Sequence, residues 1–338
     1  MAANDSGSEV DNKSWSCADV VSKNTYAQYM FVYAIGPVCI SGIILNVLNI
    51  KTFTKINKDK LLGVYLLRCL AYSDITVLST SFIIFSLRRL LGQIITGDHV
   101  FHAIYGEFEI IPHLYYAFVI PYFISLQVRN HMMVLVALER FLKLTFPLKA
   151  KTISTQGNAN KAIVFVIILA IGCNIWRYWW FYFTTEGEGD NPCFPSGITR
   201  LKKHPEGDEA DRMVYLTIMF VAPLGLLLLL NIVVITSLMK SLSRSQQLSK
   251  TNDKSQAAQH QLSLMTGCIC TLFFICEVPA CINRIVAPIL VKNSVLWEIG
   301  VTIRKAGLML ITLDSSSNFF IYLVTNRKFR SILNCSTK

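Results

Sequence analysis

Charged residues are scarce in this chain, and their scarcity excludes an ordinary soluble domain. Asp, Glu, Lys and Arg make up 16% of the 338 residues, and hydrophobic residues make up 53%. A soluble domain carries about 25% charged residues. With 17 Gly and 10 Pro, the chain is also unlike collagen, and its apolar fraction is too high for a disordered protein. A membrane protein with several spans remains.

Motifs for catalysis and metal binding are missing as well. The sequence contains no HExxH, no GxSxG and no phosphate-binding loop. Cys268 and Cys270 form a CxC pair in an apolar stretch without a second ligand pair, and His131 stands alone in a predicted helix. Such residues usually pack in a core rather than bind zinc. We therefore expect no enzyme activity, no cofactor and no metal site.

Seven apolar stretches are long enough to cross a bilayer, which takes about 20 residues in a helix. They are 24–50, 61–87, 110–138, 161–185, 213–239, 262–287 and 306–326. We see no repeat among them. Their number predicts an all-α membrane protein built as a seven-transmembrane-helix bundle. Prolines inside the spans are tolerated where neighbouring helices bind the freed carbonyl groups; these are Pro37, Pro121, Pro223 and Pro279.

Basic residues collect on one side of the predicted spans. With the N-terminus outside, the inner segments 51–60, 139–161, 240–261 and the tail after 326 hold 17 Lys and Arg against 3 acidic residues. This is the bias of the positive-inside rule, so topology explains the net charge of +11 and no nucleic acid is expected. The first 28 residues lack the apolar core of a signal peptide. Two glycosylation sequons, at Asn4 and Asn12, would then lie outside.

The chain end has an amphipathic pattern. Phe329, Ile332 and Leu333 follow helical spacing among basic residues, which is typical of a short helix on the inner membrane surface. Cys335 is then a candidate for palmitoylation. The alternative is a frayed tail with a free thiol. The predicted organisation is an outer segment 1–28, a bundle 29–325, and an amphipathic helix with a short tail 326–338.

Polar residues and prolines recur in the spans at characteristic spacings. They are Asn46; Leu70–Asp74 (LAYSD); Glu139-Arg140-Phe141 followed by Pro147-Leu148; Pro223; Phe273–Pro279 (FFICEVP); and Asn318–Tyr322 (NFFIY). In this order, each on its own span, they resemble the motifs of rhodopsin-like (class A) G-protein-coupled receptors. Glu277 stands where that family has its toggle tryptophan, and Phe319 where it has a proline.

Three fragments resemble a narrower group, the invertebrate FMRFamide-type neuropeptide receptors. They are 174–179 (NIWRYW), 139–150 (ERFLKLTFPLKA) and 315–322 (SSSNFFIY). The resemblance implies a plasma-membrane receptor with an outer N-terminus, activated by an amidated, RFamide-like peptide and signalling through a heterotrimeric G protein.

The resemblance also implies roles for individual residues. A G-protein switch would comprise Glu139, Arg140, Phe141, Asn318 and Tyr322. An internal polar network would comprise Asn46, Asp74, Arg129 and Asp314, with Arg129 bridging the two aspartates in place of a sodium ion. The ligand site would comprise Tyr122, Gln127, Tyr178, Trp179, Glu277 and Arg284. The alternatives are that Arg140 and Arg129 reach toward the lipid interface.

Two departures from the family lead to further hypotheses. No cysteine lies between Cys69 and Cys173, so the family's usual outer disulfide cannot form, and we hypothesise that Cys17 pairs with Cys193. Two separate thiols are the alternative. We also predict that Glu277 receives the arginine of an RFamide-type peptide. The alternative is an internal ion pair to Arg177 or Arg284.

A transporter or channel is the alternative of a different class. Its path would be lined by the charges inside the spans, which include Asp74, Arg129, Glu277 and Asp314. Transporters of this kind usually show inverted repeats and paired broken helices. Neither pattern is visible in the sequence.

Overall fold

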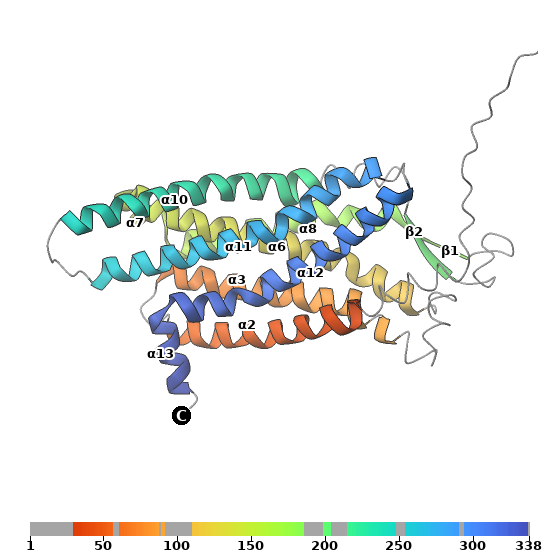
Figure 1. Cartoon of the computed structure of the whole chain (residues 1–338), viewed down its shortest axis with the longest axis horizontal. Coiled ribbons are helices and arrows are strands. Elements are labelled where there is room, and N and C mark those ends of the chain that lie inside the picture. Colours follow the sequence, from red (N-terminus) through yellow and green to blue (C-terminus); the bar gives the residue numbers. More distant parts are fainter. Residues whose placement is uncertain are drawn as a thin grey trace, which may run out of the picture.

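The computed structural model is an elongated bundle of helices (Figure 1). It describes residues 30–56, 61–87, 89–91, 110–185, 199–203, 215–247, 254–290 and 294–336. Seven of its helices are long and apolar enough to cross a membrane, within the ranges just given. The predicted seven-helix fold is thus confirmed. Asn4, Asn12, Cys17 and Cys193 lie outside the described residues, as do the side chains of Arg284 and Cys335.

The spans are formed by α-helices that three π-helical turns extend at the ends predicted to lie outside, which are called the outer ends below. The π-helical turns are Met30–Ile35, Phe82–Leu87 and Tyr215–Val221. The α-helices are α2 (Gly36–Ile56), α3 (Leu62–Ser81), α6 (Ile110–Thr145), α7 (Pro147–Ile153), α8 (Gln156–Asn174), α10 (Ala222–Gln247), α11 (Lys254–Leu290), α12 (Ser294–Thr325) and α13 (Arg327–Ser336).

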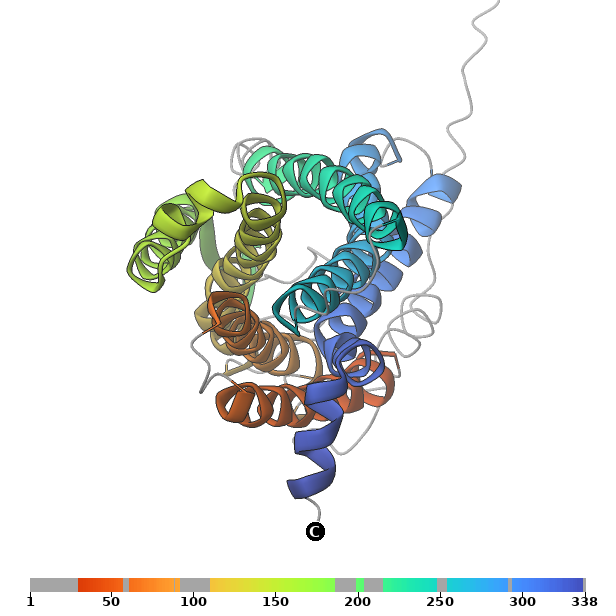
Figure 2. The same cartoon turned by 90° about the vertical axis from the view of Figure 1, so that its left-hand side faces the viewer.

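Viewed along its long axis, the bundle is a ring in which α8 lies at the periphery, beside α6 (Figure 2). The other spans pack more closely: α3 contacts α2 and α6, and α12 contacts α2, α3 and α11. The sequence of α8 fits this place, because Val166, Ala170 and Asn174 are buried at four-residue spacing while most of its other residues are exposed. Such a helix shows one narrow face to the protein and the rest to lipid.

A proline inside a span leaves one backbone carbonyl without its usual donor. At two such places a side chain bonds to that carbonyl instead. Pro121 cannot donate to the carbonyl of Ala117, and the hydroxyl of Tyr178 donates to that oxygen over 3.2 Å. Pro223 likewise frees the carbonyl of Met219, which accepts a hydrogen bond from Nδ2 of Asn130 over 3.1 Å. In each case a neighbouring helical segment supplies the missing donor, as the membrane interior requires.

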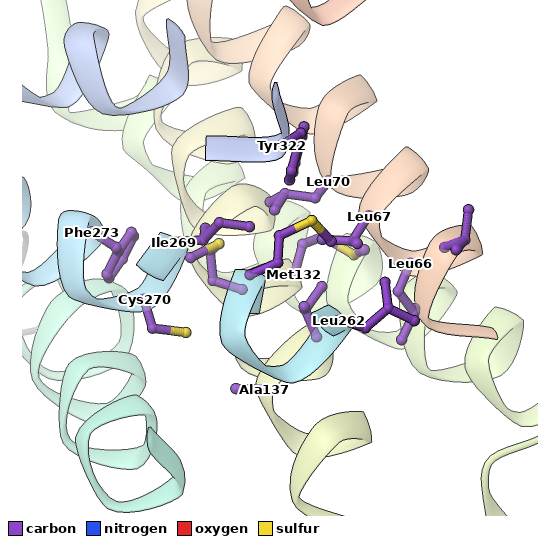
Figure 3. Packing of buried hydrophobic residues seen from close by; sticks show 14 of the residues in the cluster. Leu66, Leu67, Leu70, Met132, Ala137, Leu262, Ile269, Cys270, Phe273 and Tyr322 are labelled. Atoms are coloured by element: carbon purple, nitrogen blue, oxygen red, sulfur yellow. The ribbon is translucent and has the colours of Figure 1, made fainter. Parts of the chain in front are cut away.

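The inner half of the bundle has an apolar core. Side chains from α3, α6, α11 and α12 meet there in one buried cluster (Figure 3). Leu67 and Leu70 of α3, Met132 of α6, Ile269 of α11 and Tyr322 of α12 are each at most 1% exposed. Tight packing of this kind holds the four helices at a fixed spacing.

At the outer end the fourth span is shorter than the sequence suggested. We predicted a span to residue 185, but the α-helix ends at Asn174, a 3₁₀ turn covers Ile175–Trp180, and the chain then becomes strand β1 (Phe181–Thr185). It pairs with β2 (Thr199–Lys203) in an antiparallel hairpin, with Phe181 opposite Lys203. Run length alone cannot separate helix from strand in aromatic sequence.

At the inner end, by contrast, helices continue past the predicted span limits. Residues 139–145 belong to α6, and 240–247 and 254–261 belong to α10 and α11. Charged residues end an apolar run, but they do not end a helix, because Lys, Arg and Glu have good helix propensity. Gln261 of α11 also donates from Nε2 to the carbonyl of Thr325 over 2.7 Å.

Helix α13 turns away from the axis of α12 at this end (Figure 1). Asn326 caps its start, because its Oδ1 accepts from the N–H of Phe329 over 3.0 Å. Phe329 is buried against the rings of Phe53 and Tyr322. Arg330 donates to the carbonyls of Leu323 and Val324, which end α12. The surface position of α13 in the membrane stays a prediction.

Candidate functional site

The centre of the bundle holds an arginine bound by three carboxylates. Nε of Arg129 lies 2.9 Å from Oδ1 of Asp74, and Nη1 lies 2.9 Å from Oε1 of Glu277. Its Nη2 pairs with Oδ2 of Asp314. All four side chains are at most 1% exposed. The cluster thus ties α6 to α3, α11 and α12 at one depth of the bundle.

The cluster contains more acid than base. If all three carboxylates were ionised, the single guanidinium would leave two negative charges unbalanced. Burying unpaired charge in a membrane is expensive. Oε2 of Glu277 and Oδ1 of Asp314 also accept no hydrogen bond in the described part of the chain. The ring of Phe273, whose centroid is 5.2 Å from Cζ of Arg129, shields the guanidinium from solvent and adds a cation–π contact.

Amide side chains extend the cluster toward the first and seventh spans. Nδ2 of Asn318 donates to Oδ2 of Asp74 over 2.8 Å. Nδ2 of Asn46 donates to the carbonyl of Ser315 over 2.8 Å, and Oδ1 of Asn46 accepts from Asn49. Of the four residues of the predicted internal network, the structure joins Asp74, Arg129 and Asp314 directly, and Asn46 bonds to the backbone of Ser315, next to Asp314.

Glu277 also belongs to this network, although its sequence position did not predict this. We expected it to face a ligand or to pair with Arg177 or Arg284. The structure instead pairs it with Arg129, and Arg177 lies with its Cζ 4.4 Å above the ring of Phe123. The spacing along one helix cannot reveal such a partner, since the depth and rotation of α11 against α6 are set by packing. Only the presence of an acid deep in a span signalled a role.

The inner end of α6 carries the predicted switch residues. Nε of Arg140 lies 2.7 Å from Oε2 of Glu139, and Nζ of Lys143 lies 2.6 Å from Oε1 of the same carboxylate. Glu139 and Arg140 are buried. Phe141 is half-buried and stacks edge-on with Phe146. The Glu139–Arg140 pair is compact, and Lys143 brings a second positive charge to the same carboxylate.

The other two predicted switch residues, Asn318 and Tyr322, lie one turn apart on α12. Asn318 joins the Arg129 cluster through Asp74. Tyr322 is fully buried between the rings of Phe53 and Phe329, and its hydroxyl has no hydrogen-bond partner among the described residues. A buried hydroxyl without a partner costs free energy. Tyr322 can therefore gain stabilisation from any rearrangement that offers its hydroxyl a partner.

The predicted ligand residues whose side chains are described contact several different parts of the bundle. Oε1 of Gln127 accepts from Nδ2 of Asn174 over 2.7 Å, and both side chains are buried. Tyr122 is buried and stacks edge-on with Phe85. 

Two of the predicted ligand residues, Tyr178 and Trp179, lie in the 3₁₀ turn that follows α8. Tyr178 packs its ring against Tyr116 and bonds to the α6 backbone. Trp179 is 78% exposed. Tyr178 therefore contacts α6, and the side chain of Trp179 lies largely at the surface of the bundle.

Comparisons with known proteins agree with the fold. The family model of the 7 transmembrane receptor (rhodopsin family) matches residues 45–322. The chain is 25% identical over 275 residues to an FMRFamide receptor of Drosophila melanogaster, a stretch that makes up 79% of this chain and 46% of that receptor. The chain thus spans about half the length of this curated relative. The predicted resemblance to both groups is confirmed, and the chain belongs to the rhodopsin family of seven-transmembrane receptors.

Proposed function

We propose that the chain is a G-protein-coupled receptor of the plasma membrane, with its N-terminus outside, for an amidated RFamide-like peptide. The similarity to an FMRFamide receptor supports the peptide class. The buried Glu139–Arg140 pair supports the signalling role, because an arginine held by its neighbour at the inner end is a two-state element of the kind that ligand binding can bias.

The observation that carries the ligand proposal is the excess of acid around Arg129. Three carboxylates share one guanidinium, and Oε2 of Glu277 and Oδ1 of Asp314 have no hydrogen-bond partner among the described residues. A peptide arginine that reaches Glu277 would bring a second positive charge to a cluster in which carboxylates outnumber guanidinium groups. Charge complementarity of this kind favours a cationic ligand over a neutral or anionic one.

The peptide arginine would compete with Arg129 for Glu277. When the ligand takes one oxygen of Glu277, the contact between Arg129 and α11 weakens, and α11 becomes freer to move relative to α6. Binding and the movement of a helix would thus be linked through one carboxylate. Tyr122, Gln127, Tyr178, Trp179 and Arg284 remain the proposed surroundings of the peptide.

The test is ligand-stimulated nucleotide exchange. Membranes from cells that express the chain are mixed with purified heterotrimeric G proteins of several classes and a panel of amidated peptides. We expect exchange to rise with a peptide ending in Arg-Phe-amide and to stay basal with the same peptide as a free acid. Solute flux into liposomes that contain the purified chain, with no exchange on any G protein, would instead support a transporter or channel.

A further inference from the structure

Gly63, the second residue of α3, lies directly against the guanidinium of Arg140. A Cβ atom added at Gly63 would lie 2.6 Å from Cζ and 3.3 Å from Nε of Arg140, and closer still to Nη2. Non-bonded carbon atoms do not approach so closely. The guanidinium of Arg140 therefore occupies the space that any side chain at position 63 would need.

This space is part of what keeps Arg140 buried. Its guanidinium is enclosed between the start of α3 and the carboxylate of Glu139, with Nε 2.7 Å from Oε2. Glu139 is held in turn by Lys143. Around them, Leu66 and Leu67 belong to the apolar cluster that fixes α3 against α6. The helices cannot separate without breaking that cluster, so the arginine is the element that gives way.

Local backbone needs do not explain a glycine here. Gly63 lies within a regular α-helix, where alanine is the more stable residue. The missing side chain matters instead because it leaves a notch on α3, and the notch accepts the tip of Arg140. Since that tip is the end of a flexible side chain, a methyl group at 63 would expel it at low cost to the rest of the fold.

We infer that Gly63 is a positioning residue of the G-protein switch: its lack of a side chain holds Arg140 in the buried, Glu139-paired state, and a side chain at 63 releases Arg140. The inference rests on the proposed signalling function. It concerns the balance between two states of the switch and not the ligand site.

The first experiment compares Gly63→Ala with Gly172→Ala. Gly172 lies in α8 of the same bundle, and an added Cβ there meets nothing within 4 Å, so it controls for the glycine-to-alanine change. We expect Gly63→Ala to raise peptide-independent nucleotide exchange about tenfold, the effect of roughly 1.4 kcal/mol of overpacking in the buried state. Gly172→Ala should match the unmodified protein. Unchanged basal exchange in a well-expressed Gly63→Ala protein would overturn the inference.

The second experiment needs no G protein and so separates this inference from the proposed function. The midpoint of thermal unfolding is measured for purified Gly63→Ala, Arg140→Ala and the double variant. We expect Gly63→Ala to lower the midpoint by roughly 2–6 °C when Arg140 is present and not when Arg140 is alanine. Equal effects in the two backgrounds would show that the contact is not with Arg140 and would overturn the inference.

Folding failure of the single variant is also informative. If Gly63→Ala does not reach the cell surface, the Arg140→Ala background should restore it, because the clash is removed with the guanidinium. A double variant that is also retained inside the cell would contradict the inference. A chain that activates no G protein with any peptide contradicts the proposed function, and the unfolding measurements then decide on Gly63.

Discussion

Nη1 of Arg129 lies 2.9 Å from Oε1 of Glu277, and this contact joins α6 to α11 in the middle of the bundle. Both side chains are shielded from bulk solvent, since Arg129 is 1% exposed and Glu277 is 0% exposed. An ion pair in such a place contributes little net stability, but losing one partner is costly, because the other is left as an uncompensated buried charge. Several experiments exploit this asymmetry.

Replacing Arg129 with serine should abolish surface expression. The change strands Asp74, Glu277 and Asp314 together, and the loss of a partner from a buried ion pair costs about 3–5 kcal/mol. A total stability of about 5–15 kcal/mol leaves little reserve. Immunostaining of a tag at residue 1 on intact cells measures the outcome.

The matched control for this prediction is Arg68→Ser. Arg68 also lies within a span, but it makes no ion pair with a carboxylate among the described residues and instead lies 5.4 Å from the ring centroid of Tyr65. Its variant should keep surface expression. Adding Asp314→Asn to Arg129→Ser should restore expression in part. Normal expression of Arg129→Ser alone would contradict the prediction.

Sodium should have little effect on the affinity of the peptide. The guanidinium of Arg129 already occupies the space beside Oδ1 of Asp74, and Nδ2 of Asn318 donates a hydrogen bond to Oδ2 of that carboxylate. A sodium ion would have to displace a bound cation of the same charge. Competition binding in sodium chloride and in choline chloride at equal ionic strength is the measurement. A tenfold or larger difference between the two salts would show that the ion does bind there.

Asn130→Ala should destabilise the protein by about 1 kcal/mol, because it removes the donor to the Met219 carbonyl that Pro223 leaves free. Pro223→Ala restores a backbone N–H at that point. We therefore expect Asn130→Ala to cost less in a Pro223→Ala background than alone, as judged by thermal unfolding of the purified chain. Equal losses would mean that Asn130 stabilises the fold through another contact.

Glu277→Gln keeps the shape of the side chain and removes its charge. If the peptide arginine binds there, potency should fall by about 30-fold or more, since truncating a buried charge pair costs about 2–5 kcal/mol. A peptide analogue with citrulline in place of arginine should lose far less potency when Glu277 is changed to glutamine. Equal losses for the two peptides would show that Glu277 serves only Arg129, and that the peptide arginine binds elsewhere.

Spacing along single helices predicted a large part of the fold and of the site. Asp314 and Asn318 are four residues apart, which places them on one face of a helix, and both lie at the Arg129 cluster. Glu277 could not be assigned to the cluster in this way, because its partner is on another helix and the relative depth of two helices is a packing result. The backbone at Trp179 could not be predicted from spacing either, because the α-helix ends five residues before it and a 3₁₀ turn follows.

The ion pair between Arg129 and Glu277 gives α11 a fulcrum in mid-bundle. From Glu277 the helix runs 23 residues inward to Lys254, a lever of about 35 Å at 1.5 Å per residue. A tilt of about 10° at the fulcrum would move the far end by about 6 Å, which is more than one helical turn. The contacts that oppose such a tilt near the inner end are apolar packing and the hydrogen bond from Gln261 to Thr325. A tilt about this carboxylate would therefore displace the inner end of α11 far more than the middle of the bundle.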